Sequence, residues 1–191
     1  MSRYDVIIVP DGFYDSGEKN FTAKIRDWVN SGGVLICLGS ASKWASQNGI
    51  GSTKMRGRKW PINPKEGQKQ YNAVSLPGTI IEARINPKHY LTMGYRNEPL
   101  PVRMETNSAF EPNDQADPPV FFKNSGDIHL GGLNYQSSLD RLAATPYVTE
   151  ESIGSGKVIL FLQDPNYRLY WHGLTRLFLN SVILSPAFLQ N

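Results

Sequence analysis

Residues 33–42, with the sequence GVLICLGSAS, constrain the fold of this chain more than any other stretch. Five apolar residues in a row, 34–38, are typical of a strand buried on both faces. Gly39 then provides a tight turn, and Ser40 can cap a short helix that begins there. The only cysteine, Cys37, lies where a nucleophile elbow would carry a reactive thiol. The stretch therefore predicts an α/β domain and raises the question of whether the thiol does chemistry.

The flanking sequence predicts a parallel sheet. Residues 4–9 form a second apolar, β-branched run that ends at a Pro-Asp-Gly turn. Residues 18–30 place apolar side chains at helical spacing, and the glycines at 32 and 33 end this helix. Strand, helix, strand and helix within the first fifty residues indicate a right-handed βαβ crossover.

The middle of the chain, residues 50–150, reads as a loop- and strand-rich insertion. Short strands are expected over 76–85, 99–105 and 119–123, with an acidic, proline-rich loop over 110–119. The basic stretch 50–71 is interpreted as a solvated loop in preference to a basic contact surface. A turn at 154–157, a core strand over 158–162 and a helix over 167–184 complete a three-layer, mostly parallel α/β sheet of flavodoxin-like or amidotransferase-like type.

Length, charge and hydropathy limit the class of protein and the kinds of partner that this chain can have. The 191 residues suffice for one domain with a hydrophobic core, and a formal charge of +3 is too small to predict a nucleic-acid partner. No apolar run reaches the length of a membrane span, and the first residues do not form a signal peptide. Because a core strand starts almost at residue 1, we expect a single domain over 1–191 that belongs to a longer protein. Its cellular location is left open, with export as part of the parent protein as one alternative.

Polar residues follow three of the expected strands. They are Asp11, then Ser40 and Ser42, then Asp164, Asn166 and Arg168. Ligands of parallel α/β sheets gather at the carboxyl ends of the strands, so these six residues are candidates for a ligand pocket. The competing interpretation is structural, with Ser40 as a helix cap and Asp164 paired with Arg168.

The turn after Cys37 resembles the elbow of class I glutamine amidotransferases. In that family a histidine and a glutamate follow a later core strand and activate the thiol. Here Asp164-Pro165-Asn166 stands in that place. A carboxylate near a thiol raises the pKa of the thiol and makes it less reactive. We therefore expect Cys37 to be a buried, unreactive strand residue.

The wider pattern resembles the amidotransferase-like domain that is appended to certain zinc carboxypeptidase-like proteins. The matching segments are 5–12, 27–36, 39–42, 76–80, 125–126, 154–161, 164–168 and 173–180. The resemblance implies a domain without a catalytic triad, whose partner is the peptidase domain of the same parent chain. The histidines His89, His129 and His172 form no His-x-x-Glu pair, so a catalytic zinc of the carboxypeptidase type is not expected in this chain. We also expect no other metal site and no cofactor.

Three functions remain open from the sequence. The first is a non-catalytic accessory domain that packs on, or assists, a zinc carboxypeptidase-like domain. The second is a cysteine-dependent hydrolase or amidotransferase that uses Cys37. The third is a module that binds a small ligand or glycan in the pocket described above. Assembly into a homo-oligomer is compatible with each of them.

Overall fold

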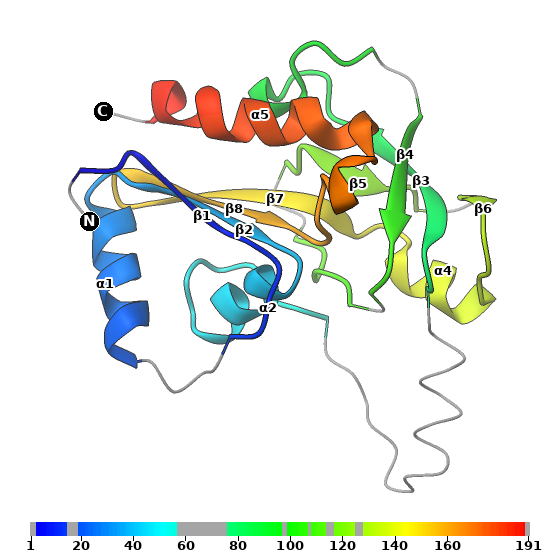
Figure 1. Ribbon diagram of the computed structural model, residues 1–191, viewed down its shortest axis with the longest axis horizontal. Helices are drawn as coiled ribbons and strands as arrows, with labels where there is room; N and C mark the ends of the chain where they lie inside the picture. Colours follow the sequence, from blue (N-terminus) through cyan, green and yellow to red (C-terminus); the bar gives the residue numbers. More distant parts are fainter. Residues whose placement is uncertain are drawn as a thin grey trace, which may run out of the picture.

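The computed structural model describes residues 3–14, 19–56, 76–96, 99–106, 108–113, 117–124 and 128–189. Its centre is one eight-stranded mixed sheet with the order β1-β2-β8-β7-β5-β3-β4, in which β6 also pairs with β3 (Figure 1). The strands are β1 (Val6–Val9), β2 (Val34–Leu38), β3 (Thr79–Ile85), β4 (Leu100–Met104), β5 (Val120–Phe122), β6 (His129–Gly131), β7 (Pro146–Ile153) and β8 (Gly156–Phe161).

Four α-helices surround this sheet in the described part of the chain. They are α1 (Lys19–Asn30), α2 (Ser40–Gln47), α4 (Gln136–Leu142) and α5 (Thr175–Ile183), with 3₁₀ turns at Tyr90–Thr92, Tyr167–Leu169, His172–Leu174 and Ser185–Phe188. Helices α1 and α2 lie on one side of the sheet and α5 on the other (Figure 1). The rings of Phe21 and Trp44 join α1 to α2 at 6.1 Å, and Phe178 of α5 meets Phe161 of β8 at 6.5 Å. The predicted three-layer α/β fold is confirmed.

The sheet has a parallel half and an antiparallel half. Strands β1, β2 and β8 run parallel, and all residues of β2 and β8 are buried, as a strand covered on both faces requires. From β8 onward, β7, β5, β3 and β4 pair antiparallel. The strands expected over 76–85, 99–105 and 119–123 are β3, β4 and β5, and the turn predicted at 154–157 joins β7 to β8.

The prediction of one helix over 167–184 is wrong in its first part. Its first part consists of two 3₁₀ turns, and the α-helix spans only Thr175–Ile183. Arg168 and Leu169 have φ values of 50° and 56°, a left-handed conformation that an α-helix cannot contain. Among the helices described, none is long and apolar enough to cross a membrane.

Two of the segments discussed in the sequence lie outside the described residues. They are residues 57–71 of the basic stretch and residues 125–126, one of the segments that carry the resemblance.

Candidate functional site

The sharp turn between β2 and α2 is centred on Gly39, two residues after Cys37. Gly39 has φ 55° and ψ −118°, a conformation that residues with a side chain adopt only under strain. A Cβ atom at this position would lie 2.7 Å from Oδ1 of Asp11. The elbow position is therefore occupied by a residue without a side chain, and the carboxyl group of Asp11 fills the adjacent space.

Asp11 and Ser40 tie the ends of β1 and β2 together. The backbone N–H of Ser40 donates to Oδ1 of Asp11 at 2.8 Å, and the Ser40 hydroxyl also contacts this oxygen. The N–H of Gly12 donates to the Ser40 hydroxyl at 2.9 Å. Asp11 thus satisfies a free N–H at the start of α2, a role that carboxylates at helix N-termini commonly have.

Cys37 lies inside the sheet and is inaccessible to solvent. It pairs with Val9 of β1 and Leu160 of β8, and its side chain is completely buried. Burial raises the pKa of the Cys37 thiol, because the thiolate would lose its hydration.

The histidines serve other parts of the fold. Nε2 of His89 lies 3.8 Å from the carboxylate of Glu150, and Nε2 of His129 lies 2.8 Å from the carbonyl oxygen of Gly132. His172 is exposed in a 3₁₀ turn before α5. In the described residues, none of these imidazole interactions involves Cys37, and burial is the one cause that shifts the pKa of its thiol.

A cleft of about 350 Å³ opens at the carboxyl ends of β1, β2 and β8, where the sequence predicts a ligand pocket. Of the six predicted residues, it brings together Asp11 and Ser40. The complete lining is Asp11, Gly39, Ser40, Lys43, Met55, Glu105, Thr106, Ser108, Leu162 and Gln163. We call it the Asp11 cleft.

The other four predicted residues lie outside this lining. The buried hydroxyl of Ser42 bonds to the carbonyl oxygens of Cys37 and Phe161, at 2.9 and 2.8 Å, so it fastens α2 to the sheet. Oδ1 of Asp164 accepts from the N–H of Asn166 at 2.9 Å, which makes a local turn. No ion pair joins Asp164 to Arg168 in the described part of the chain.

Arg168 instead belongs to a group of charges next to the Asp11 cleft. Its guanidinium lies 5.1 Å from the ring centre of Tyr167, and the guanidinium of Arg103 lies 3.5 Å from the same ring centre. Arg103 holds Glu105 through a hydrogen bond and its charge, and this lowers the pKa of the Glu105 carboxyl. The N–H of Glu105 donates to Oε1 of Gln163 at 3.0 Å. Glu105 therefore enters the cleft as an oriented carboxylate, which the sequence reasoning missed.

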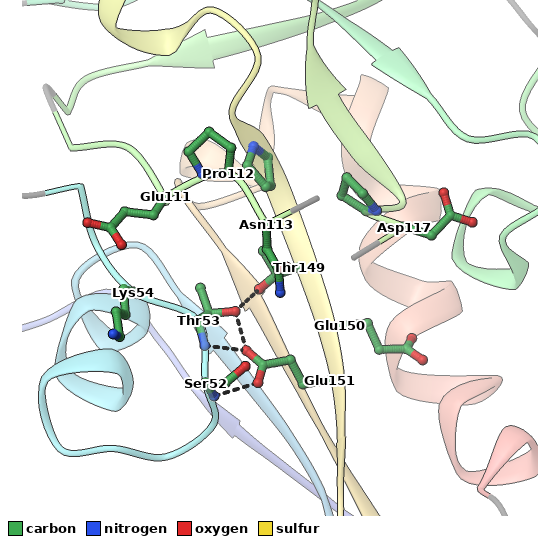
Figure 2. A pocket seen from close by; sticks show the side chains of 12 residues that line it. Ser52, Thr53, Lys54, Glu111, Pro112, Asn113, Asp117, Thr149, Glu150 and Glu151 are labelled. Atoms are coloured by element: carbon green, nitrogen blue, oxygen red, sulfur yellow. Dashed lines mark hydrogen bonds between the residues drawn. The ribbon is translucent and has the colours of Figure 1, made fainter. Parts of the chain in front are cut away.

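A second cleft, of about 480 Å³, lies beside β7 near the point where pairing with β5 stops (Figure 2). The carboxylate of Glu151 accepts from the N–H groups of Ser52 and Thr53, at 2.5 and 2.7 Å, and contacts the Thr53 hydroxyl. Figure 2 shows Glu150 pointing away from this cluster, on the other side of the strand. Glu151 thus serves to hold the segment after α2. In the ranges described, no group of three or more metal-ligating side chains occurs.

Solved structures with a similar fold support the assignment of the architecture. A cytoplasmic protein from Salmonella typhimurium matches 96% of this chain and 72% of its own at a TM-score of 0.52 and 16% identity. A ThuA-like protein from Bacteroides uniformis matches 93% of this chain and 67% of its own, at 0.51 and 12%. A β-galactosidase from Bacillus circulans sp. alkalophilus matches 97% of this chain at 0.52 and 14%, but this chain spans only 22% of that protein.

These similarities identify the fold and nothing finer. The ThuA-like neighbours have a glutamine amidotransferase-like fold, and this chain shares it. No protein-family model matches the chain, and no curated protein matches it.

Proposed function

We propose that this chain is a non-catalytic, amidotransferase-like accessory domain of a zinc carboxypeptidase-like protein. The observation that carries the non-catalytic part is the elbow, where Gly39 replaces a nucleophile and Asp11 fills the adjacent space. Activation of a nucleophile requires a base within hydrogen-bond reach. The buried Cys37 has no such partner among the described residues, which favours a role other than thiol chemistry.

Two observations favour an accessory role. The match to the β-galactosidase covers 97% of this chain and 22% of that protein, so this fold can form one part of a longer enzyme. In addition, Leu179 and Ile183 lie four residues apart on α5 and are 47% and 67% exposed, and Phe188 is 47% exposed. Exposed apolar side chains at helical spacing are typical of a docking surface. We call these three residues the α5 face and propose that it packs on the peptidase domain.

The test begins with the reading frame upstream of Met1, which should encode a domain with a His-x-x-Glu pair. That domain and this chain, produced as separate polypeptides, should form a complex in size-exclusion chromatography. The Ile183→Glu variant should abolish the complex, whereas Leu130→Glu, at a comparably exposed apolar residue on β6, should leave it intact. An in-frame stop codon before Met1, or a peptidase domain that does not bind, would refute the proposal.

A second candidate is binding of a small polar ligand in the Asp11 cleft. The specific observation is that Asp11 and Glu105 provide carboxylates, Lys43 an ammonium group and Gln163 an amide around about 350 Å³. Ligand pockets in proteins usually have about this volume or more. Sugars and amino acids that bind there should raise the melting temperature, and Asp11→Ala should remove the increase. A ligand that stabilises both proteins equally would count against this cleft.

A further inference from the structure

A third cleft lies at the opposite end of the parallel strands from the Asp11 cleft. It has a volume of about 480 Å³ and is formed where the chain enters β1 and where α1 ends. These two segments lie together near the N-terminus in Figure 1. The lining residues are Tyr4, Asp5, Lys24, Asp27, Trp28, Ser31, Gly32 and Gly33. We call it the Asp27 cleft.

The electrostatics of the Asp27 cleft favour a cation. Asp27 lies in the last turn of α1, where no basic residue offsets the partial negative charge of the helix end. An aspartate at this position destabilises a helix, so its presence here calls for another explanation. Asp5 adds a second exposed carboxylate, and Lys24 is the single basic residue of the lining. Neither carboxylate has an ion pair within the described ranges.

The aromatic side chains of the Asp27 cleft favour an alkylated cation over a metal ion. Tyr4 is 66% exposed and therefore available to a ligand. Trp28 is fixed in place: its Nε1–H donates to the carbonyl oxygen of Tyr4 at 3.2 Å, and its ring packs closely on Gly33, where a Cβ atom would lie 2.3 Å away. Aromatic rings beside carboxylates attract ammonium groups that carry methyl groups, because the ring faces are negative and apolar.

We propose that the Asp27 cleft binds an alkylated ammonium group, with Asp5, Asp27 and the end of α1 providing the charge complement and Tyr4 and Trp28 the apolar contact. This site is independent of the Asp11 cleft and of the α5 face, which involve none of its lining residues. The ligand lies on the surface in contact with water, so we expect affinity in the millimolar range.

The test compares choline with 3,3-dimethylbutan-1-ol, its uncharged analogue of the same shape, at constant ionic strength. In ¹H–¹⁵N NMR spectra, choline should produce saturable shifts of the Trp28 indole N–H and of the amides of Gly32 and Gly33. The uncharged analogue should produce much smaller shifts at the same concentration. Equal shifts with both compounds would overturn the proposal, as would the absence of saturable shifts with choline.

Two variants separate binding from folding. Asp27→Asn should weaken choline binding about two- to fivefold, as expected for an exposed charge contact, while the melting temperature stays the same or rises because an unfavourable helix-end charge is removed. Tyr4→Leu should weaken binding by a similar factor of about two to five through loss of the ring. Asp117→Asn, the same chemical change in the cleft beside β7, is the control and should leave binding unchanged. Unaltered binding in both Asp27→Asn and Tyr4→Leu would refute the assignment.

Discussion

Replacing Gly39 by alanine should destabilise the fold strongly, although the change adds one methyl group. The conformation at φ 55° and ψ −118° costs about 1–3 kcal/mol for a residue with a side chain. The new Cβ would also lie 2.7 Å from Oδ1 of Asp11, so Asp11 must move and weaken its hydrogen bond to the N–H of Ser40, at a cost of about 1 kcal/mol. We expect a total loss of about 2–4 kcal/mol, or a decrease of roughly 5–15 °C in melting temperature for a domain of this size.

A double-mutant cycle with Asp11→Ala separates the two contributions. In the Asp11→Ala background the clash is absent, so Gly39→Ala should cost only the conformational part, and the coupling energy should be about 1 kcal/mol. Urea denaturation followed by tryptophan fluorescence measures all four free energies of unfolding. A loss below about 1 kcal/mol for Gly39→Ala, or strict additivity of the two changes, would refute the idea that Asp11 fills the elbow.

Three further predictions concern buried polar groups. The hydroxyl of Tyr147 is buried without a hydrogen-bond partner in the described residues, so Tyr147→Phe should raise the free energy of unfolding by about 1 kcal/mol, as measured by urea denaturation. Glu150→Ala should lower the free energy of unfolding by about 3–5 kcal/mol, because the Lys157 ammonium group, 2.6 Å from the carboxylate, would lose its partner in a buried position. Adding Lys157→Met to the Glu150→Ala protein should restore part of the loss. No restoration would contradict this explanation. Burial lowers the pKa of His89 below the value of an unfolded chain, so the folded protein binds fewer protons. Stability should therefore fall as the pH drops below about 6.5, and His89→Gln should flatten that part of a pH series; an unchanged pH profile would show that another group is responsible.

The parallel half of the sheet could be predicted because each strand carries its own signal. The run Val34–Leu38 is apolar at every position, and the structure buries all of it. The antiparallel half could not be predicted in the same way. Strand β7 contains Thr149, Glu150 and Glu151, three polar residues that interrupt the apolar pattern typical of a core strand. Glu150 is tolerated inside the fold because two groups bind its carboxylate: Lys157 of the adjacent strand β8, and Tyr90, which is distant in the sequence.

The candidate site likewise contains residues that the sequence predicted and residues that it did not. Asp11 and Ser40 follow predicted core strands, so the rule for strand ends located them. Glu105 follows β4, whose place in the sheet depends on antiparallel pairing that the sequence does not specify. The residue at the elbow could not be predicted from the sequence either, because only the backbone angles show that Gly39, and not Cys37, lies at the turn.

The central claim is that the elbow remains but carries no nucleophile, and the reactivity of the one thiol tests it most directly. The rate at which iodoacetamide modifies Cys37 should be compared at pH 7.5 in folded protein and in protein unfolded in urea. We predict negligible modification of folded protein and complete modification after unfolding, because burial both excludes the reagent and raises the thiol pKa. Modification of the folded protein as fast as, or faster than, that of the unfolded chain would contradict the account.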